Sequence, residues 1–308
     1  NKIDWQPISY TKKPPVLSTV YDVNRIKRLA FKLHQQRQFK VVHCRSYIAA
    51  LIGLQMKKKF QTKFIFDMRG FWADERVDGK LWNLKNPVYK TVYNFFKKKE
   101  KQFLENADYT VSLTQNAKEE MHSWKHIANN PVKIKVIPCC ADLELFDKNK
   151  VDQQKITAIK NELQIKENDF ILMYLGSIGT WYMLTEMMQF FAEFKKQEPN
   201  AKFLFVTKDE HERILKTADH YHVKDAIIIR PGNRNEIPAL ISLCDYSIFF
   251  ILPSYSKRAS SPTKQGEIMA MGKPVICNSQ VGDTDYIINK YNAGYIVNDV
   301  YSMNFSED

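Results

Sequence analysis

The chain has 308 residues, of which 44% are hydrophobic, and it carries a formal net charge of +12. This length and apolar content exclude a disordered or low-complexity chain and are sufficient for two globular domains. The five cysteines are odd in number and include no CxxC pair, which argues against a disulfide framework or a zinc site and predicts a reducing, cytoplasmic location.

The positive charge is concentrated in the first half of the chain. Residues 1–150 have a net charge of +15, and residues 151–308 have a net charge of −3. Nucleic acid and an anionic membrane are the usual partners of such a basic region, and a solvated lysine-rich surface is the alternative. The longest hydrophobic tract is interrupted by Asp245, so it predicts a helix end followed by a strand instead of a membrane span.

Short apolar, β-branched runs alternate with longer amphipathic segments, a pattern typical of βα units around parallel sheets. The predicted strands, in chain order, are residues 40–43, 63–67, 109–113, 133–138, 170–175, 202–207, 226–230, 246–252, 274–277 and 294–297. The polar stretch 146–155 is the predicted linker. We therefore expect an α/β protein with two doubly wound, Rossmann-like domains, residues 1–150 and 151–308.

The residues that follow these strands are the first candidates for a binding site, because ligands of open α/β sheets bind beyond the carboxyl ends of the strands. Polar or glycine residues stand at several of these ends: His43, Arg45, Ser46, Asp67, Arg69, Asp74, Glu75, Thr114, Gly176, Ser177, Gly179 and Lys208. With two facing domains, we expect these residues to line one cleft. Taken singly, each is more often a helix cap or a satisfied loop residue.

The stretch SSPTKQGEIMAMGKPVICNS predicts a short helix over residues 263–271 and a buried strand after it. Ser261 or Thr263 can cap the start of the helix. Lys264 and Glu267 lie near its amino end, where unpaired N–H groups and the helix dipole attract an anion. A phosphate could bind there while Glu267 accepts hydrogen bonds from hydroxyl groups. The alternative interpretation is a capped surface helix with a Lys264–Glu267 ion pair.

Four stretches resemble motifs of glycosyltransferases of the GT-B architecture, specifically the retaining nucleotide-sugar transferases of family 4 of bacterial type. They follow the order of the family over about residues 40–298 and read FIFDMRGFWADE, KVIPCCADLELF, MYLGSIGTW and SPTKQGEIMAMGKPVI. The last stretch is the most specific, and it resembles the donor-site helix of the family.

The resemblance implies a cleft between two Rossmann-like domains and transfer of a sugar from a nucleotide diphosphate-sugar to a glycan or lipid-linked acceptor, in bacterial surface polysaccharide synthesis. In the family, the residue that matches Glu267 accepts the two ribose hydroxyls, a task suited to a carboxylate. The implied donor-binding residues are Gly176, Ser177, Ser261, Thr263, Lys264 and Glu267, and the implied catalytic residues are Asp67 and Arg69. We expect no metal or other cofactor, so the DTD at 283–285 is interpreted as a loop.

The sequence departs from the family pattern at several points. Ala259 stands where the family often carries a second Glu that contacts the transferred sugar. The Arg and Lys that usually bind the diphosphate in the glycine loop are replaced by Ser177 and by Trp181 or Tyr182. We also expect the N-terminal domain to lack the first strand and glycine-rich loop of the family, and the chain to stop before the C-terminal helix that crosses back.

Other functions are compatible with parts of the sequence. A dehydrogenase is disfavoured because no GxGxxG follows a predicted strand. A GT-B nucleotide-sugar epimerase would share the architecture and the donor, so it stays an alternative. A basic nucleic-acid-binding protein is suggested only by the charge of the first half, and we expect no nucleic-acid partner because no recognised motif accompanies the lysines.

Residues 86–107 predict an amphipathic helix that carries Lys97, Lys98, Lys99 and Lys101. These lysines suggest peripheral attachment of a cytoplasmic protein to an anionic membrane, which would bring the cleft to a membrane-proximal acceptor. The alternative is a core helix with a solvated lysine face.

Overall fold

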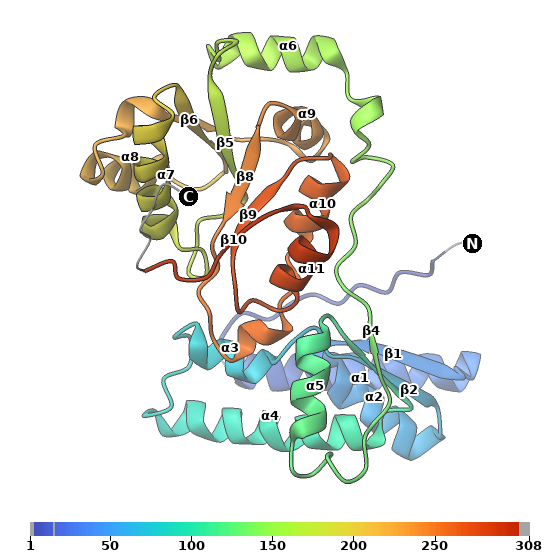
Figure 1. The fold of residues 1–308 in the computed structure, drawn as a ribbon. Helices are drawn as coiled ribbons and strands as arrows, with labels where there is room; N and C mark the ends of the chain where they lie inside the picture. Colours follow the sequence, from blue (N-terminus) through green and yellow to red (C-terminus); the bar gives the residue numbers. More distant parts are fainter. Residues whose placement is uncertain (1–2, 15, 302–308) are drawn as a thin grey trace. The chain divides into compact units, whose positions relative to one another are not determined.

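The computed structural model describes residues 3–14 and 16–301, and its contacts divide the chain into two compact α/β units, Asn1–Ile137 and Pro138–Asp308 (Figure 1). Each of the ten predicted strands is confirmed, and each predicted end lies within three residues of the observed end. The predicted domain boundary at residues 150 and 151 stays a prediction.

The first unit contains a four-stranded parallel sheet in the order β1-β2-β3-β4. Its strands are β1 (Val41–Arg45), β2 (Lys63–Asp67), β3 (Tyr109–Ser112) and β4 (Ile134–Val136). Its helices are α1 (Leu17–Arg37), α2 (Ser46–Phe60), α3 (Trp72–Asp78), α4 (Pro87–Asn106) and α5 (Gln115–Ser123). Every connection leads to the next strand in the same direction, so right-handed crossovers place their helices on one face of the sheet.

Side chains of β2 alternate between the two faces of this sheet. Phe64 and Phe66 are fully buried on the face that α2 and α4 contact. Asp67 lies on the opposite face, because successive side chains of a strand point to opposite sides. The carboxylate of Asp67 therefore stands at the carboxyl end of β2, where ligands of such sheets bind.

The second unit contains a six-stranded parallel sheet in the order β10-β9-β8-β5-β6-β7. Its strands are β5 (Phe170–Leu175), β6 (Ala201–Val206), β7 (Ile227–Arg230), β8 (Tyr246–Phe249), β9 (Val275–Asn278) and β10 (Gly294–Val297). Its helices are α6 (Gln153–Glu162), α7 (Leu184–Gln197), α8 (His211–His220), α9 (Ile237–Ser242), α10 (Thr263–Ala270) and α11 (Thr284–Tyr291). Figure 1 shows α7 and α8 on one side of this sheet and α9, α10 and α11 on the other.

This strand order is that of nucleotide-binding Rossmann folds, with its reversal between β5 and β8. In such sheets, the crevice at the reversal point is the usual ligand site. The loop after β5 and the segment between β8 and α10 begin at this point. The topology alone therefore indicates that a ligand site would be formed by these two segments.

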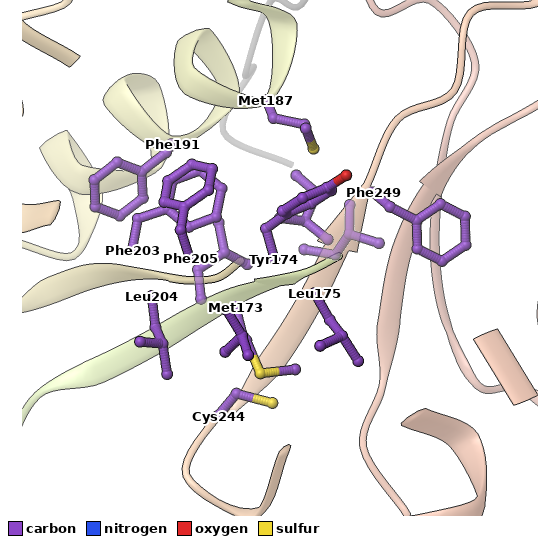
Figure 2. Close-up of a cluster of buried hydrophobic side chains, with 14 of the residues drawn as sticks. Met173, Tyr174, Leu175, Met187, Phe191, Phe203, Leu204, Phe205, Cys244 and Phe249 are labelled. Atoms are coloured by element: carbon purple, nitrogen blue, oxygen red, sulfur yellow. The ribbon is translucent and has the colours of Figure 1, made fainter. Parts of the chain in front are cut away.

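A large part of the core of the second unit lies on the neighbouring strands β5 and β6. Figure 2 shows the aromatic side chains of Tyr174, Phe203 and Phe205 on one side of these strands, with Met173 and Leu204 on the other. All five side chains are buried. Strands buried on both faces read as continuous apolar runs, which is why the sequence pattern predicted them well.

The helix predicted over residues 86–107 is α4, and its apolar side chains Phe96, Phe103 and Leu104 are buried. Lys97 is not part of a solvated lysine face. Its ammonium lies 2.9 Å from a carboxylate oxygen of Asp74 and 2.5 Å from one of Glu100, which is itself buried. In the described part of the chain, no helix combines the length and the hydropathy that a bilayer-spanning segment requires.

Candidate functional site

The loop after β5 begins with Gly176, whose φ of 119° lies in a region that favours glycine. A β-carbon at this position would lie 3.1 Å from the ammonium nitrogen of Lys264, so a side chain would also crowd that group. The predicted donor residue Ser177 holds this loop in place, because its hydroxyl donates to Asp209 at 2.7 Å. The amide of Ile178 donates to the same carboxylate oxygen at 2.6 Å.

The helix predicted over 263–271 is α10, Thr263–Ala270, and it begins at the predicted residue, but its cap differs from the prediction. Its N-cap residue is Pro262, and no side chain caps it. Ser261 was predicted as a possible cap, but its hydroxyl instead accepts a hydrogen bond of 3.1 Å from the amide of Cys139. Thr263 is exposed. The amino end of α10 therefore keeps the helix N–H groups that a cap would otherwise satisfy.

Lys264 lies in the first turn of α10 with its ammonium nitrogen enclosed and without a hydrogen-bond partner. The nitrogen is 3.8 Å from the ring centre of Tyr182 and 4.4 Å from that of Tyr174. Burial lowers the pKa of Lys264 to about 7, although the nearby charge of Glu267 acts in the opposite direction. A buried cation held only by ring faces would gain strongly from an anionic ligand.

The Lys264–Glu267 ion pair offered as the alternative interpretation does not form. Glu267 is buried and pairs instead with Arg234, whose guanidinium nitrogen lies 2.5 Å from a carboxylate oxygen. The same guanidinium lies 4.7 Å from the ring centre of Phe146. Arg234 was not among the site residues expected from the sequence, although it follows a predicted strand within PGNRNE, a position that could have suggested it.

The first unit contributes the other predicted site residues. One carboxylate oxygen of Asp67 lies 3.5 Å from Nε2 of His43, and the other is buried without a hydrogen-bond partner. Arg69 and Gly70 follow with φ values of 61° and 127°. A non-glycine residue in this region stores backbone strain, which is common at functional sites.

The structure thus brings three of the predicted donor residues into one place in the second unit. Gly176 lies beside Lys264, because a β-carbon on Gly176 would come within 3.1 Å of the Lys264 ammonium nitrogen, and Glu267 follows three residues later on α10. Ser177 and Ser261 use their hydroxyls to hold neighbouring segments. Asp67 and Arg69 lie on one loop of the first unit. Within residues 3–14 and 16–301, no three His, Cys, Asp or Glu side chains gather as a metal site.

This arrangement can bind two kinds of group. The helix N–H groups and the Lys264 ammonium favour an anion at the amino end of α10. The carboxylate of Glu267 is an acceptor-only group and suits a hydroxyl-bearing ligand. An anion joined to a hydroxyl-bearing group, such as a nucleoside diphosphate, matches both features.

Two protein-family models match the chain. The model described as Glycosyltransferase Family 4 matches residues 6–145, and the model described as Glycosyl transferases group 1 matches residues 155–307. The matches follow one another along the chain, one in the basic half and one in the half that contains α10.

Two curated relatives carry the same name, alpha-monoglucosyldiacylglycerol synthase. The protein from Acholeplasma laidlawii is 22% identical over 193 residues, which are 62% of this chain and 46% of the relative. The protein from Streptococcus pneumoniae is 18% identical over 281 residues, which are 84% of this chain and 60% of the relative. The chain thus spans about half of the first relative and three fifths of the second.

Among solved structures, HepE of Anabaena in complex with UDP and glucose aligns with a TM-score of 0.62. The alignment covers 92% of this chain and 68% of that chain, at 12% identity. At this level of identity, the likeness shows a shared fold.

Proposed function

The chain belongs to the family 4 type of GT-B glycosyltransferases, and we propose that it transfers a sugar from a nucleotide diphosphate-sugar to a glycan or lipid-linked acceptor. One observation carries the proposal. At the reversal point of the second sheet, a buried and unpartnered ammonium, Lys264, stands at an uncapped helix start, and the buried carboxylate of Glu267 follows on the same helix.

On the donor side, the diphosphate would bind the amino end of α10 and the ammonium of Lys264. Negative charge grows on the leaving diphosphate in the transition state, so fixed positive groups at this point would speed the reaction. Glu267 would accept the ribose hydroxyls. Gly176 would let the loop backbone approach the phosphates closely, because it has no side chain. We propose that these groups act without a metal ion, and that the anomeric configuration is retained.

On the acceptor side, we propose roles for Asp67 and Arg69. Asp67 has one buried oxygen without a protein partner, which supports a role in binding a hydroxyl or in orienting the neighbouring His43. Arg69 lies in the strained turn that follows. Asp67→Asn should lower the turnover number and leave the affinity for the donor nearly unchanged. Loss of folding without a separate kinetic effect would contradict this assignment.

The relatives support both substrates. The two curated relatives are named for a glucosylated diacylglycerol, which supports a lipid-linked acceptor here. The HepE complex contains UDP and glucose, so UDP is the first nucleotide to test. We further propose that the protein acts at the cytoplasmic face of a membrane in the synthesis of surface polysaccharide, attached peripherally through basic residues of the first unit.

The donor site is tested by calorimetric titration with UDP, GDP and ADP. Glu267→Ala should weaken binding of the preferred nucleotide by about 1.5 to 3 kcal/mol, the range for a hydrogen bond to a charged group. Glu212→Ala is the matched control, because it removes an exposed carboxylate on α8. Unchanged affinity in Glu267→Ala would overturn the assignment of the donor site.

A nucleotide-sugar epimerase is the second candidate, because it would use the same fold and donor. Incubation with the donor and without acceptor, followed by analysis of the sugar, separates the two functions. A transferase leaves the configuration of the donor sugar unchanged at every carbon. Appearance of an epimeric sugar would favour the epimerase.

A further inference from the structure

Arg234 lies outside every motif that the sequence singled out, yet it is the partner of the carboxylate that anchors the proposed donor. We propose that Arg234 is a positioning residue, which acts on the nucleotide through Glu267. It fixes one oxygen of this buried carboxylate, so that the group is oriented to accept ribose hydroxyls. The inference rests on the proposed function and assigns a role to a residue outside the motif.

The geometry of the pair is asymmetric. The side chain of Glu267 is 7% exposed, whereas that of Arg234 is 56% exposed, with 2.5 Å between Nη1 and Oε1. The carboxylate is thus enclosed in the protein, and its partner reaches it from the surface. Oε1 is the oxygen that Arg234 contacts, so in the proposed arrangement Oε2 would accept a ribose hydroxyl.

The backbone that carries Arg234 is held firmly. Arg234 begins a short 3-10 helix, Arg234–Glu236, which is closed by a capping box between Asn233 and Glu236. Arg230 bonds Glu236 at 3.0 Å and also pairs with Glu162, so the segment is tied to the end of β7 and to α6. The ring of buried Phe146 lies 4.7 Å from the guanidinium of Arg234. A side chain anchored at its base and supported on a ring is suited to orienting another group.

The charges around Glu267 explain why its contact with Arg234 matters. Burial disfavours the charged form of a carboxylate, and an adjacent guanidinium favours it. Two cations face Glu267, Arg234 from the 3-10 helix and Lys264 from its own helix. The ammonium of Lys264 itself is poorly solvated, and burial lowers its pKa. Arg234 is therefore the permanent positive charge beside the carboxylate of Glu267.

A double-mutant cycle tests the inference, with UDP, GDP and ADP as probes in calorimetry of the full chain. Arg234→Gln should weaken binding of the preferred nucleotide about tenfold, in line with loss of support for one charged hydrogen bond. In the background of Glu267→Gln, where no buried charge needs support, the same substitution should change affinity less than about twofold. Arg234→Lys should restore part of the affinity, because it restores the charge without the planar fork.

Lys216→Gln is the matched control, because it removes an exposed positive charge on α8. It should leave the affinity unchanged. A tenfold loss that persists in the Glu267→Gln background would show direct contact of Arg234 with the nucleotide and overturn the inference. A lower melting temperature with unchanged affinity would also overturn it, since Arg234 would then be structural. If Arg234→Gln does not fold, Arg234→Lys in both backgrounds supplies the same comparison. Absence of nucleotide binding by the unmodified chain would contradict the proposed function itself.

Discussion

Lys264 combines a buried ammonium with contacts that offer it no hydrogen bond, and this makes it the most sensitive titrating group of the proposed site. Burial lowers its pKa to about 7. A diphosphate beside the ammonium would favour the charged form and raise that pKa. The proposed function therefore includes a proton that enters the site together with the ligand.

Proton uptake by Lys264 can be measured by comparing the unmodified protein with a variant that lacks the ammonium. At pH 8, about nine tenths of the ligand-free protein has a neutral Lys264 if its pKa is about 7. Binding of a nucleoside diphosphate should then take up close to one proton, seen in calorimetry as a binding enthalpy that depends on the ionisation enthalpy of the buffer. Lys264→Met should bind more weakly and take up no proton at this pH. Equal proton uptake by both proteins would contradict the assignment.

The same residue gives the stability of the ligand-free protein a defined dependence on pH. The pKa of Lys264 lies below its ordinary value of 10.5 in the folded state. Between about pH 7 and pH 10.5 the unfolded chain therefore binds more protons, and the contribution of Lys264 to stability increases with pH in this window. Lys264→Met should consequently stabilise the ligand-free protein most at or below pH 7. Chemical unfolding of the two proteins at pH 6.5 and pH 9.5 measures the difference.

Residue-level pairing was the least predictable part of the candidate site. Lys264 and Glu267 could be selected from the sequence because they occur in one short helix with a recognisable start and end. Their partners could not, since Glu267 pairs with Arg234, which is 33 residues earlier, and Lys264 lies against the rings of Tyr174 and Tyr182. Such contacts depend on how β5, the loop after it and the 3-10 helix after β7 pack against α10, and helical spacing contains no information about that.

At the scale of elements, α4 shows that one lysine of a lysine-rich run can stabilise the fold while the next is exposed. Lys97 and Lys98 are neighbours in the sequence, yet Lys97 lies between Asp74 and Glu100 whereas Lys98 is exposed. Burial raises the pKa of Glu100, and the ammonium of Lys97 opposes this effect. The hydroxyl of Tyr47 also donates to Glu100. The cluster ties α3, which follows the Asp67 loop, to α4.

Removing the cation of this cluster should be costly. Lys97→Met leaves two buried carboxylates without their cation and should lower the free energy of unfolding by about 3 to 5 kcal/mol. Lys98→Met is the matched control and should change it by less than about 0.5 kcal/mol. Urea unfolding followed by circular dichroism provides both values. Equal effects of the two substitutions would refute the structural role of Lys97.

The strands were predictable because a strand buried on both faces consists of a short run of apolar residues. The segment at 170–175 is apolar throughout, and it forms the central strand β5, buried over most of its length. Strand order was not predictable, because it depends on crossovers between segments far apart in the chain. The reversal between β5 and β8, which locates the candidate site, therefore had to come from the structure.

At the scale of the whole molecule, the uneven charge makes membrane attachment testable. Lys98, Lys99 and Lys101 can be neutralised together, whereas Lys97 must be kept because it stabilises the fold. Each lysine near an anionic surface contributes about 1 kcal/mol, and salt screens this attraction. The triple Gln variant should therefore sediment less with vesicles that contain phosphatidylglycerol, and the unmodified chain should be released as salt is raised.

A control variant tests whether attachment depends on the position of the lysines or only on the net charge of the protein. Lys166, Lys216 and Lys224 are exposed in the second unit, and changing these three to Gln removes the same charge. This control should sediment with anionic vesicles as the unmodified chain does. Equal loss in both triple variants, or no attachment of the unmodified chain at low salt, would contradict attachment through α4.

Diffraction from crystals grown with the preferred nucleoside diphosphate is the most direct test of where the nucleotide binds. We predict density for the diphosphate at the amino end of α10, beside the ammonium of Lys264 and the backbone of Gly176, and ribose hydroxyls within hydrogen-bond distance of Glu267. Density for the nucleotide at any other place in the second unit, or ribose density away from Glu267, would contradict the proposed donor site.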